Sequence, residues 1–376
     1  MQETDWKPRP GLLPYWLYQK RRGPMLVTDS MRKIVVFIGH KSADGDFFPD
    51  GTGFLLLLEA HSFGFFYVVT AKHVIDQAAG KDRDRQVLLR VNTKDGGIDY
   101  IPTTFKTWQT HPDHTETGRK QRYIDVAVYG LVNYREWGKS NIDKLDFSYI
   151  MEEDFCTDEI IKKYMIGLGD EVSIPGLFLS HIGTSQNVPI VRTGNIAALR
   201  GEPVPTSYGP MDGYLVEMRS VGGISGSPVV ANMAVRPNVI YPGSPVEQTI
   251  EHSEKAHYLL GLIHGHYTIT TQDEWVFKTD QQVGDINAGI AVVVPISKVT
   301  ETIEASSLFA EDFEMARQFR EMENAKSGAK PDSAPSAASP SPASEVPPPA
   351  NGENPKHRED FTRLVGAAAR KQEPEG

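Results

Sequence analysis

The chain has 376 residues, of which 39% are hydrophobic and 23% charged, and its 49 acidic and 39 basic side chains leave a net charge of −10. At about 150 residues per unit, this length predicts roughly two or three folding units with a sizeable core. The negative charge argues against a nucleic-acid partner, because binding to a phosphate backbone requires a basic surface. The single cysteine, Cys156, excludes an intrachain disulfide and every metal site built from several cysteines.

The N-terminal region does not have the pattern of a targeting signal. Residues 1–10 are polar and contain prolines, without an apolar core before a cleavage site. The most apolar stretch, residues 54–69, is interrupted by Glu59, His61 and Gly64, so it does not have the pattern of a membrane span. We therefore expect a cytoplasmic protein without a membrane partner.

Composition sets both ends of the chain apart. Residues 1–30 hold several prolines and a short basic run, and we expect them to form an irregular lead-in. Residues 326–356 consist mainly of Ala, Ser and Pro, a composition that cannot bury enough apolar surface to fold and that predicts a disordered linker. Residues 357–372 predict a short amphipathic helix, whose apolar face is formed by Phe361, Leu364, Val365 and Ala368. This tethered helix either docks on a partner or on the rest of the chain, or is an end without a role.

The segment between these ends, residues 31–325, has the pattern of an all-β protein. Short apolar runs rich in Val, Ile, Leu and Phe recur between Gly and Pro turn signals, as in a sandwich or a barrel. Residues 55–71 are expected to form a hairpin. A helical pattern appears only late, where Ser297 is a candidate N-cap and residues 311–322 are charged. The predicted strands lie at residues 34–38, 54–58, 65–70, 87–91, 126–132, 171–174, 214–218, 228–230, 259–264 and 291–294.

Three short strings carry residues suited to catalysis by a serine hydroxyl. They are residues 70–74 (T-A-K-H-V), which follow an apolar run, residues 125–128 (D-V-A-V), which enter another, and residues 222–229 (G-G-I-S-G-S-P-V). Acyl transfer by serine needs a base for the hydroxyl proton, a carboxylate that orients the base, and N–H donors for the oxyanion. Glycines on both sides of a serine let the backbone turn tightly and present its N–H groups.

These strings, in the order His, Asp, Ser, resemble the motifs of the chymotrypsin-like (trypsin-like) serine proteases, especially the bacterial members without disulfides. Residues 260–264 resemble the strand that follows the serine, and residues 288–295 resemble the last strand of the family. The resemblance covers roughly residues 31–310. It implies that His73 is the general base and acid, that Asp125 orients it, and that Ser225 is the nucleophile. It also implies that the N–H groups of Gly223 and Ser225 form the oxyanion hole.

The fold that the resemblance implies consists of two antiparallel six-stranded β-barrels with the active site between them. The peptidase domain would span residues 31–325. The first barrel would cover about residues 31–140 and the second about 165–297, with a C-terminal helix at about 297–324. No metal or cofactor is implied.

Two departures from the family concern regulation. Ile224 precedes the serine where activated digestive proteases carry an aspartate that pairs with a new N-terminus, so we expect no activation of that kind. Two insertions, residues 231–257 and 267–287, lengthen loops around the second barrel. Loops of this length are usually functional or disordered. They either restrict the cleft as a lid or are solvated excursions.

The resemblance also suggests residues for substrate selection. Arg219 lies six residues before Ser225, at the expected base of the primary pocket, and His264 and His266 belong to the expected pocket wall. A cationic lining would favour an acidic residue before the scissile bond.

Two other strings are weak candidates. Residues 111–114 (H-P-D-H) fit a solvated turn better than a metal site. Residues 138–140 (G-K-S) lack the upstream glycine of a phosphate-binding loop, because position 133 is Asn.

We therefore expect a serine endopeptidase that cleaves protein or peptide substrates. The alternative is a catalytically inactive relative, an adaptor that binds partners through the cleft and the C-terminal segment. The same triad would also serve an esterase, which the two-barrel pattern disfavours.

Overall fold

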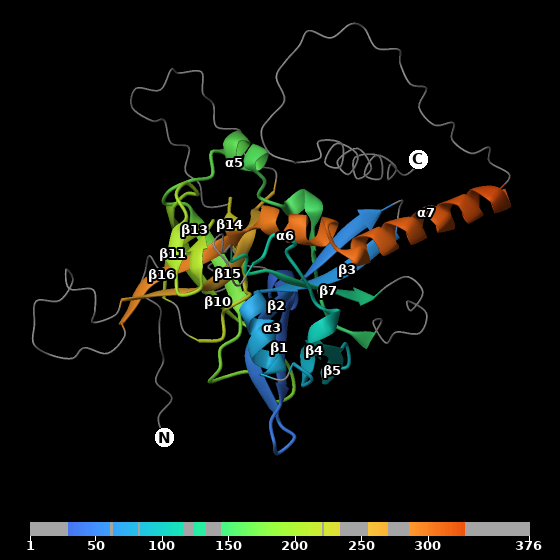
Figure 1. Cartoon of the computed structure of the whole chain (residues 1–376), viewed down its shortest axis with the longest axis horizontal. Helices are drawn as coiled ribbons and strands as arrows, with labels where there is room; N and C mark the ends of the chain where they lie inside the picture. Colours follow the sequence, from blue (N-terminus) through green and yellow to red (C-terminus); the bar gives the residue numbers. More distant parts are fainter. Residues whose placement is uncertain are drawn as a thin grey trace, which may run out of the picture.

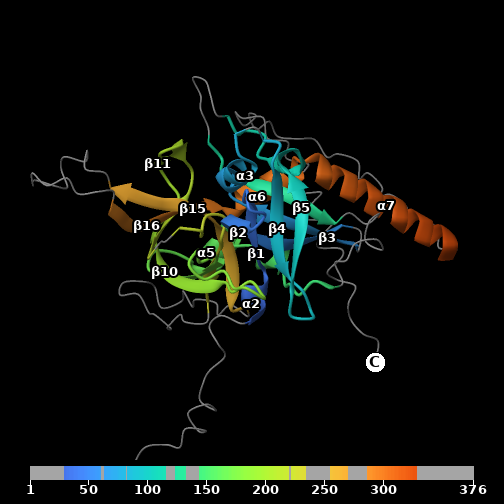
Figure 2. The same ribbon diagram turned by 90° about the horizontal axis from the view of Figure 1, so that it is seen from below.

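Two β-sheets lie side by side in the computed structural model, with helices along their border (Figure 1). The structure describes residues 29–60, 63–81, 83–115, 123–132, 144–219, 222–233, 255–269 and 286–327. Figure 2 shows the same arrangement after a quarter turn, with β15 and β16 on one side and β3, β4 and β5 on the other. The predicted tail helix, most of both insertions and all but residues 326–327 of the predicted linker lie outside the described residues, as does all but the end of the lead-in.

The first sheet is built from the N-terminal half of the chain. Its path is β5-β4-β1-β2-β3-β7-β6, and β8 pairs with β2 in parallel. The hairpin expected near residues 55–71 is confirmed, because β2 and β3 pair in register from Gly53 opposite Thr70 to Ala60 opposite Phe63. The strands are β1 (Val35–Lys41), β2 (Phe47–Ala60), β3 (Phe63–Thr70), β4 (Gln86–Asn92), β5 (Ile98–Thr104), β6 (Gln109–Thr110), β7 (Ala127–Val132) and β8 (Ile150–Met151).

The second sheet closes into a six-stranded antiparallel barrel, in the order β10-β13-β16-β15-β14-β9. A separate two-stranded hairpin, β11 (Val204–Thr206) and β12 (Gly209–Met211), lies between β10 and β13 in the chain. The barrel strands are β9 (Glu171–Gly176), β10 (Ile190–Ala198), β13 (Tyr214–Met218), β14 (Pro228–Asn232), β15 (His257–Ile269) and β16 (Ile286–Pro295).

The expectation of two closed barrels is therefore wrong for the first sheet. Within the described residues no backbone ladder joins β5 to β6, whose two residues are too few to continue the sheet. A side chain spans this edge instead. The indole Nε1 of Trp108 donates to Thr103 Oγ1 on β5 at 3.0 Å, and its ring lies 5.4 Å from that of Tyr129 on β7. The buried indole thus closes the side of the sheet that the main chain leaves open.

Helices occur earlier than the sequence pattern predicted. The short helix α2 (Asp29–Lys33) precedes β1. Between later strands lie the helices α3 (Lys72–Ala79) and α5 (Asp158–Tyr164) and the 3₁₀ turns η1 (Phe105–Thr107) and η3 (Glu152–Asp154). Of these, α5 carries a recognisable start signal, because the hydroxyl of Thr157 accepts a hydrogen bond from the N–H of Ile160 at 3.3 Å. The others are too short for a helical period to show.

The C-terminal helix is present, but as two helices. They are α6 (Ile296–Glu304) and α7 (Ser307–Ser327), and α6 begins after Pro295, one residue before the expected position. Between them the hydroxyl of Ser306 donates to the carbonyl oxygen of Ile303 at 2.6 Å and accepts from the N–H of Phe309 at 3.2 Å. This serine ends one helix and caps the next, and the C-terminal end of α7 extends beyond the sheets (Figure 1).

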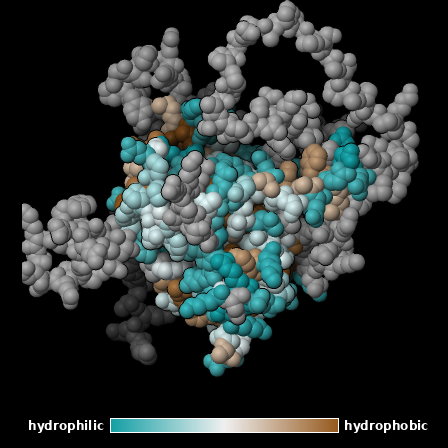
Figure 3. All heavy atoms as spheres, in the orientation of Figure 1, coloured by the Kyte–Doolittle hydropathy of each residue, from teal (hydrophilic) through white to brown (hydrophobic). Residues whose placement is uncertain are grey.

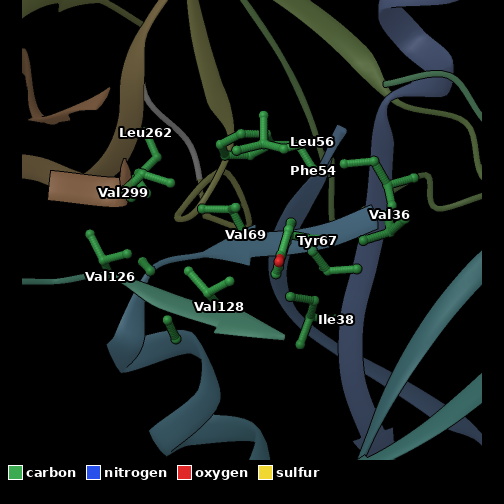
Figure 4. Close-up of a cluster of buried hydrophobic side chains, with 14 of the residues drawn as sticks. Val36, Ile38, Phe54, Leu56, Tyr67, Val69, Val126, Val128, Leu262 and Val299 are labelled. Atoms are coloured by element: carbon green, nitrogen blue, oxygen red, sulfur yellow. The ribbon is translucent and has the colours of Figure 1, made fainter. Parts of the chain in front are cut away.

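The core between the first sheet and α6 positions the candidate site. Removing one large apolar side chain of this core from water contributes about 1.5–3 kcal/mol to the free energy of folding. Side chains from β15 and α6 join those of the first sheet, so the two halves of the molecule share apolar surface. Figure 4 labels this cluster: Val36, Ile38, Phe54, Leu56, Tyr67, Val69, Val126, Val128, Leu262 and Val299.

The surface is mainly hydrophilic on the face shown in Figure 3, with hydrophobic residues in small separate areas. Among the helices that the structure describes, none is long and apolar enough to cross a membrane.

Candidate active site

His73 is held at the start of α3 by a carboxylate from the segment just before β7. The N-terminal N–H groups of a helix have no acceptor within the helix, and Ala71 at the N-cap offers no side chain for them. The N–H of His73 donates instead to Asp125 Oδ1 at 3.0 Å. A negative charge is also favourable at this end of a helix. The position of the histidine backbone is thus fixed by the same residue that contacts its ring.

Asp125 is fully buried just before β7 and accepts four hydrogen bonds, two on each oxygen. Oδ1 accepts from the His73 N–H and, at 3.4 Å, from the Tyr123 hydroxyl. Oδ2 accepts from His73 Nδ1 at 2.7 Å and from His264 Nδ1 at 2.5 Å. An ionised carboxylate only accepts hydrogen bonds, so both imidazoles carry a proton on Nδ1. A neutral His73 ring then has its lone pair on Nε2, as a general base requires.

These contacts set the protonation states of the pair. Burial by itself raises the pKa of Asp125, but the charge of His73 and the hydrogen bonds from His264 and His73 outweigh it and hold that pKa well below its ordinary value. Burial likewise lowers the pKa of His73, but the charge and hydrogen bond of Asp125 outweigh it, so the His73 pKa is raised. The aspartate is therefore an anion at neutral pH, and the histidine is a stronger base than usual.

The loop that carries Ser225 is fastened to the first sheet by Thr52 on β2. The N–H of Thr52 donates to the Ser225 carbonyl oxygen at 2.9 Å, and its hydroxyl donates to the Gly223 carbonyl oxygen at 2.8 Å. Ile224 is buried in the core of the second barrel, where its side chain anchors the loop from the other side. The loop is thus clamped between the two halves of the molecule.

Two glycines in this loop adopt conformations that favour glycine. Gly223 has φ of +97° and Gly226 has φ of +80°. Within the described residues, the backbone N–H groups of Gly223 and Ser225 have no intramolecular acceptor. Two neighbouring donors are therefore available for an anion, the arrangement expected of an oxyanion hole.

Ser225 lies close to the first turn of α3. A Cβ added at Gly51 would meet the Val74 side chain at 2.7 Å and the Ser225 carbonyl oxygen at 3.1 Å. Gly51 therefore lies between the two and in close contact with both. No hydrogen bond joins the Ser225 hydroxyl to His73 within the part of the chain that the structure describes. Catalytic hydrogen bonds are often long before substrate binds.

Aromatic rings surround His73. The ring of Tyr208, in the turn between β11 and β12, stacks on His73 with centroids 5.9 Å apart and planes at 28°. Tyr123 stacks behind Tyr208 at 4.6 Å, and the His264 ring meets His73 edge-on at 5.4 Å. The sequence interpretation missed both tyrosines. Tyr123 could have been found, since it lies two residues before Asp125 in an extended segment and so points to the same side.

The residues expected to line the substrate pocket do not gather in one place. Arg219 and His266 are exposed, whereas His264 is 6% exposed and directed at Asp125. The structure places His264 with His73 and Asp125. The physical reason is the irregular register of β15, which shifts between Ile263 and Gly265 and again between His266 and Thr268, so that His264 and His266 have different surroundings.

A pocket of about 650 Å³ opens beside Tyr123, between the first sheet, the β11–β12 hairpin and the start of α6. Its lining is largely apolar and includes three charged side chains. The lining residues are Pro112, Asp113, Thr115, Tyr123, Ile124, Pro203, Pro210, Met211, Asp212, Val294 and Lys298.

One group of described side chains could bind a metal ion by residue type: His73, Asp125 and His264, whose ligand atoms lie within 4.8 Å of one another. The separations of 2.7 and 2.5 Å between each Nδ1 and Asp125 Oδ2 are those of hydrogen bonds. Ligand atoms around tetrahedral zinc are about 3.3 Å apart when the bonds are about 2.0 Å long. The distances therefore fit shared protons better than a shared metal.

The weaker sequence candidates have structural roles or lie outside the described residues. His111 is buried rather than solvated, and its Nε2 lies 2.9 Å from Glu301 Oε2 on α6. His114 Nδ1 lies 3.0 Å from the backbone oxygen of Ile124. These contacts fix the segment before Asp125 to the C-terminal helix. Residues 138–140 are not among those that the structure describes.

No protein-family model and no curated protein sequence matches the chain. Solved structures that are similar to it share 11–15% sequence identity with it. The MamO protease domain from Magnetospirillum magneticum is 15% identical, with a TM-score of 0.39, over 73% of this chain and 97% of that chain.

Two further structures are similar to a comparable extent. Rv3671c from M. tuberculosis H37Rv, in a mutant, inactive form, is 13% identical, with a TM-score of 0.33, over 74% of this chain and 89% of that chain. The NS6 protease from murine norovirus 1 is 11% identical, with a TM-score of 0.32, over 72% of this chain and 93% of that chain.

Proposed function

We propose that this protein is a serine endopeptidase that hydrolyses peptide bonds through an acyl-enzyme on Ser225. The observation that carries the proposal is that Asp125 accepts two hydrogen bonds from His73, one from the backbone N–H at 3.0 Å and one from the ring Nδ1 at 2.7 Å. This hold fixes both the tautomer and the direction of the base. It does so beside a glycine-rich loop whose serine is followed by a second constrained glycine, Gly226.

The proposed reaction uses each group in turn. Nε2 of His73 takes the hydroxyl proton of Ser225 while the oxygen attacks the substrate carbonyl. The N–H groups of Gly223 and Ser225 stabilise the oxyanion, and Asp125 stabilises the imidazolium that forms. His73 then gives the proton to the leaving amine, and water attacks the acyl-enzyme by the same steps in reverse order.

A cavity next to the candidate site is large enough for part of a bound peptide. It has a volume of about 650 Å³ and a largely apolar lining, which includes Tyr123, a donor to Asp125, but none of His73, Gly223 and Ser225. The exposed Arg219 lies next to the nucleophile loop and would attract an acidic side chain of the substrate.

Labelling with a fluorophosphonate probe tests the proposal. The wild-type protein should be labelled, and both Ser225→Ala and His73→Ala should reduce labelling to background. Ser42→Ala, in the loop between β1 and β2, is the matched control and should be labelled like wild type. Equal labelling of wild type and Ser225→Ala would contradict the assignment of the nucleophile.

One observation favours an alternative, a protease-like adaptor without catalysis. The ring of Tyr208 covers His73, and no hydrogen bond joins Ser225 to His73 within the described residues. Such a protein would bind peptides in the cleft without cleaving them. It would retain a peptide ligand unchanged on prolonged incubation and would resist the fluorophosphonate at every pH.

A further inference from the structure

The carboxylate of Asp125 serves two histidines rather than one. His73 Nδ1 and His264 Nδ1 lie 2.7 and 2.5 Å from the same oxygen, Oδ2. His264 is 139 positions away from Asp125 in the sequence and lies on the second barrel, whereas His73 on α3 and Asp125 just before β7 lie in the half of the chain that forms the first sheet. The contact therefore crosses the boundary between the two halves of the molecule.

The strand that carries His264 also holds the nucleophile loop. The N–H of Ile263 donates to the Ser227 carbonyl oxygen at 2.9 Å, and the Ile263 carbonyl oxygen accepts from the N–H of Gly226 at 2.7 Å. One short segment of β15 is thus attached to the loop of Ser225 through its backbone and to Asp125 through a side chain. A shift of this segment would move the Ser225 loop and the Asp125 carboxylate together, so their relative position is preserved.

The surroundings of His264 hold its ring in one place. The ring is 8% exposed and is packed edge-on against His73, Tyr208 and, at 6.2 Å, Tyr123. The titratable and charged groups around the two histidines are Asp125, Tyr123, Tyr208, Lys72 and Asp76. Among these described neighbours, the carboxylate of Asp125 is the anion in direct contact with both rings.

We propose that His264 is a positioning residue: it fixes the Asp125 carboxylate from the second barrel and competes with His73 for the charge of that carboxylate. The inference rests on the proposed function in that His73 is taken as the catalytic base. A hydrogen bond from His264 disperses the negative charge that would otherwise stabilise the His73 imidazolium alone. The second histidine therefore keeps His73 unprotonated at a lower pH than a lone His–Asp pair would allow.

The first test uses the full-length wild-type protein labelled with ¹⁵N at histidine. At alkaline pH, NMR should show His73 and His264 as Nδ1–H tautomers with hydrogen-bonded protons. Resonances are assigned from the His73→Gln and His264→Asn variants. A His264 ring that carries its proton on Nε2 alone would overturn the proposal, and this result does not depend on how any variant folds.

The second test measures the titration midpoint of His73 by NMR in two variants. His264→Phe keeps a ring but removes the donor, and the midpoint should rise by about one pH unit because His73 then has the carboxylate to itself. His264→Asn keeps an N–H near the place of Nδ1, and its midpoint should stay within about 0.3 of wild type. The matched control is His257→Asn on the same strand, about 23 Å away at about 3.3 Å per residue. An unchanged midpoint in His264→Phe would overturn the proposal, since a merely structural residue would not move it.

Activity then separates the two proposals. If both hold, kcat/KM of His264→Phe falls about tenfold at neutral pH with an acid limb shifted upward, and His264→Asn stays within about threefold of wild type. If the wild type neither cleaves peptides nor reacts with the fluorophosphonate, the proposed function fails while the His73 titration still tests the role of His264. If the wild type is active and both His264 variants have its pH profile, the role of His264 fails alone.

Discussion

Tyr208 lies over the ring of His73, with 5.9 Å between the two centroids and 28° between the two planes. The tyrosine is 42% exposed and lies in a tight turn, in which the Thr206 hydroxyl donates to the Gly209 carbonyl oxygen at 2.7 Å. The tip of the β11–β12 hairpin therefore covers one face of the imidazole that we propose as the base. A substrate that packs on this face must either share it with the tyrosine or move the hairpin.

Removing this ring should expose His73 and speed the reaction of Ser225 with a small reagent. For Tyr208→Ala we expect the rate constant of fluorophosphonate labelling to rise about 3- to 10-fold, which corresponds to roughly 1 kcal/mol of lost ring contact. Tyr208→Phe keeps the stacked ring and should react like wild type. Slower labelling of the alanine variant would mean that the tyrosine supports the base rather than covers it.

The raised pKa of His73 predicts the pH dependence of peptide hydrolysis. Burial lowers this pKa, but the charge and hydrogen bond of Asp125 raise it by more. The pKa of His73 therefore lies above the usual histidine value of about 6.5. Only the unprotonated ring is a base. We therefore expect kcat/KM to fall as the pH decreases, with a midpoint above about 6.5.

The same shift affects stability with a defined sign. A raised folded-state pKa contributes stability that is complete below the unfolded-state pKa of about 6.5 and is lost as the pH rises through the folded-state value.

The activity profile can contradict the raised pKa. A midpoint of kcat/KM below about 6, measured on the full chain with a peptide substrate, would mean that the effect of burial on the His73 pKa exceeds that of Asp125.

Gly226 is predicted to be intolerant of any side chain. A Cβ at this position would collide with the Thr52 carbonyl oxygen and the Thr70 hydroxyl, which itself donates to that carbonyl at 2.6 Å. We expect Gly226→Ala to displace the loop of Ser225 and to lower the rate of labelling by at least about 100-fold, since misplacement by about 1 Å can cost that much.

Gly45 provides a matched control for Gly226. It also has a positive φ, +89°, but a Cβ there would have nothing within 4 Å. Gly45→Ala therefore carries the backbone strain, about 1–2 kcal/mol, without the collision. Its labelling rate should equal that of wild type. An equal loss in both variants would trace the effect to global destabilisation, which thermal unfolding would confirm.

Asp312 on α7 is predicted to lower the stability of the protein above a pH of about 6. The Tyr67 hydroxyl donates to its carboxylate at 2.8 Å, and burial, against this hydrogen bond, raises the Asp312 pKa to about 6. Because the folded-state pKa exceeds the unfolded value of 3.8, the contribution is present below pH 3.8 and is lost as the pH rises through about 6. The difference corresponds to about 3 kcal/mol at 1.36 kcal/mol per unit.

Asp312→Asn tests this contribution. The amide oxygen still accepts from Tyr67 but carries no charge, so the free energy of unfolding should increase by up to about 3 kcal/mol near pH 8 and change little near pH 4. Urea titrations at both pH values measure it, with the exposed Glu159→Gln as control. A variant that is less stable than wild type near pH 8 would show that the carboxylate is stabilising after all.

The sequence predicted those parts of the site that local pattern encodes. His73, Asp125 and Ser225 are recognisable because each stands in a short string next to a strand, and the structure brings His73 and Asp125 into contact. His264 was expected in a pocket wall, and Tyr208 was not considered. Both reach His73 through contacts between distant segments, which no local period or spacing records.

For the fold, too, the sequence predicted the features that a local pattern encodes. Strand runs such as the β2–β3 hairpin follow from apolar alternation and turn residues, and so does the late helix at Ile303. Closure of a sheet depends instead on pairing between edges. In the first sheet that pairing is replaced by a hydrogen bond between the side chains of Trp108 and Thr103, which no pattern along the chain records. The same limit applies to α3, whose cap comes from Asp125 rather than from a neighbour in the chain.

Cys156 is 2% exposed in the core of the second barrel, and its N–H donates to the Leu259 carbonyl oxygen on β15 at 2.9 Å. It is also the sole sulfhydryl of the 376-residue chain. A maleimide can reach this buried sulfur only when the packing around Cys156 opens locally. The native chain therefore carries its own single-site reporter, and its alkylation rate gives the frequency with which this part of the second barrel opens, without any engineered label.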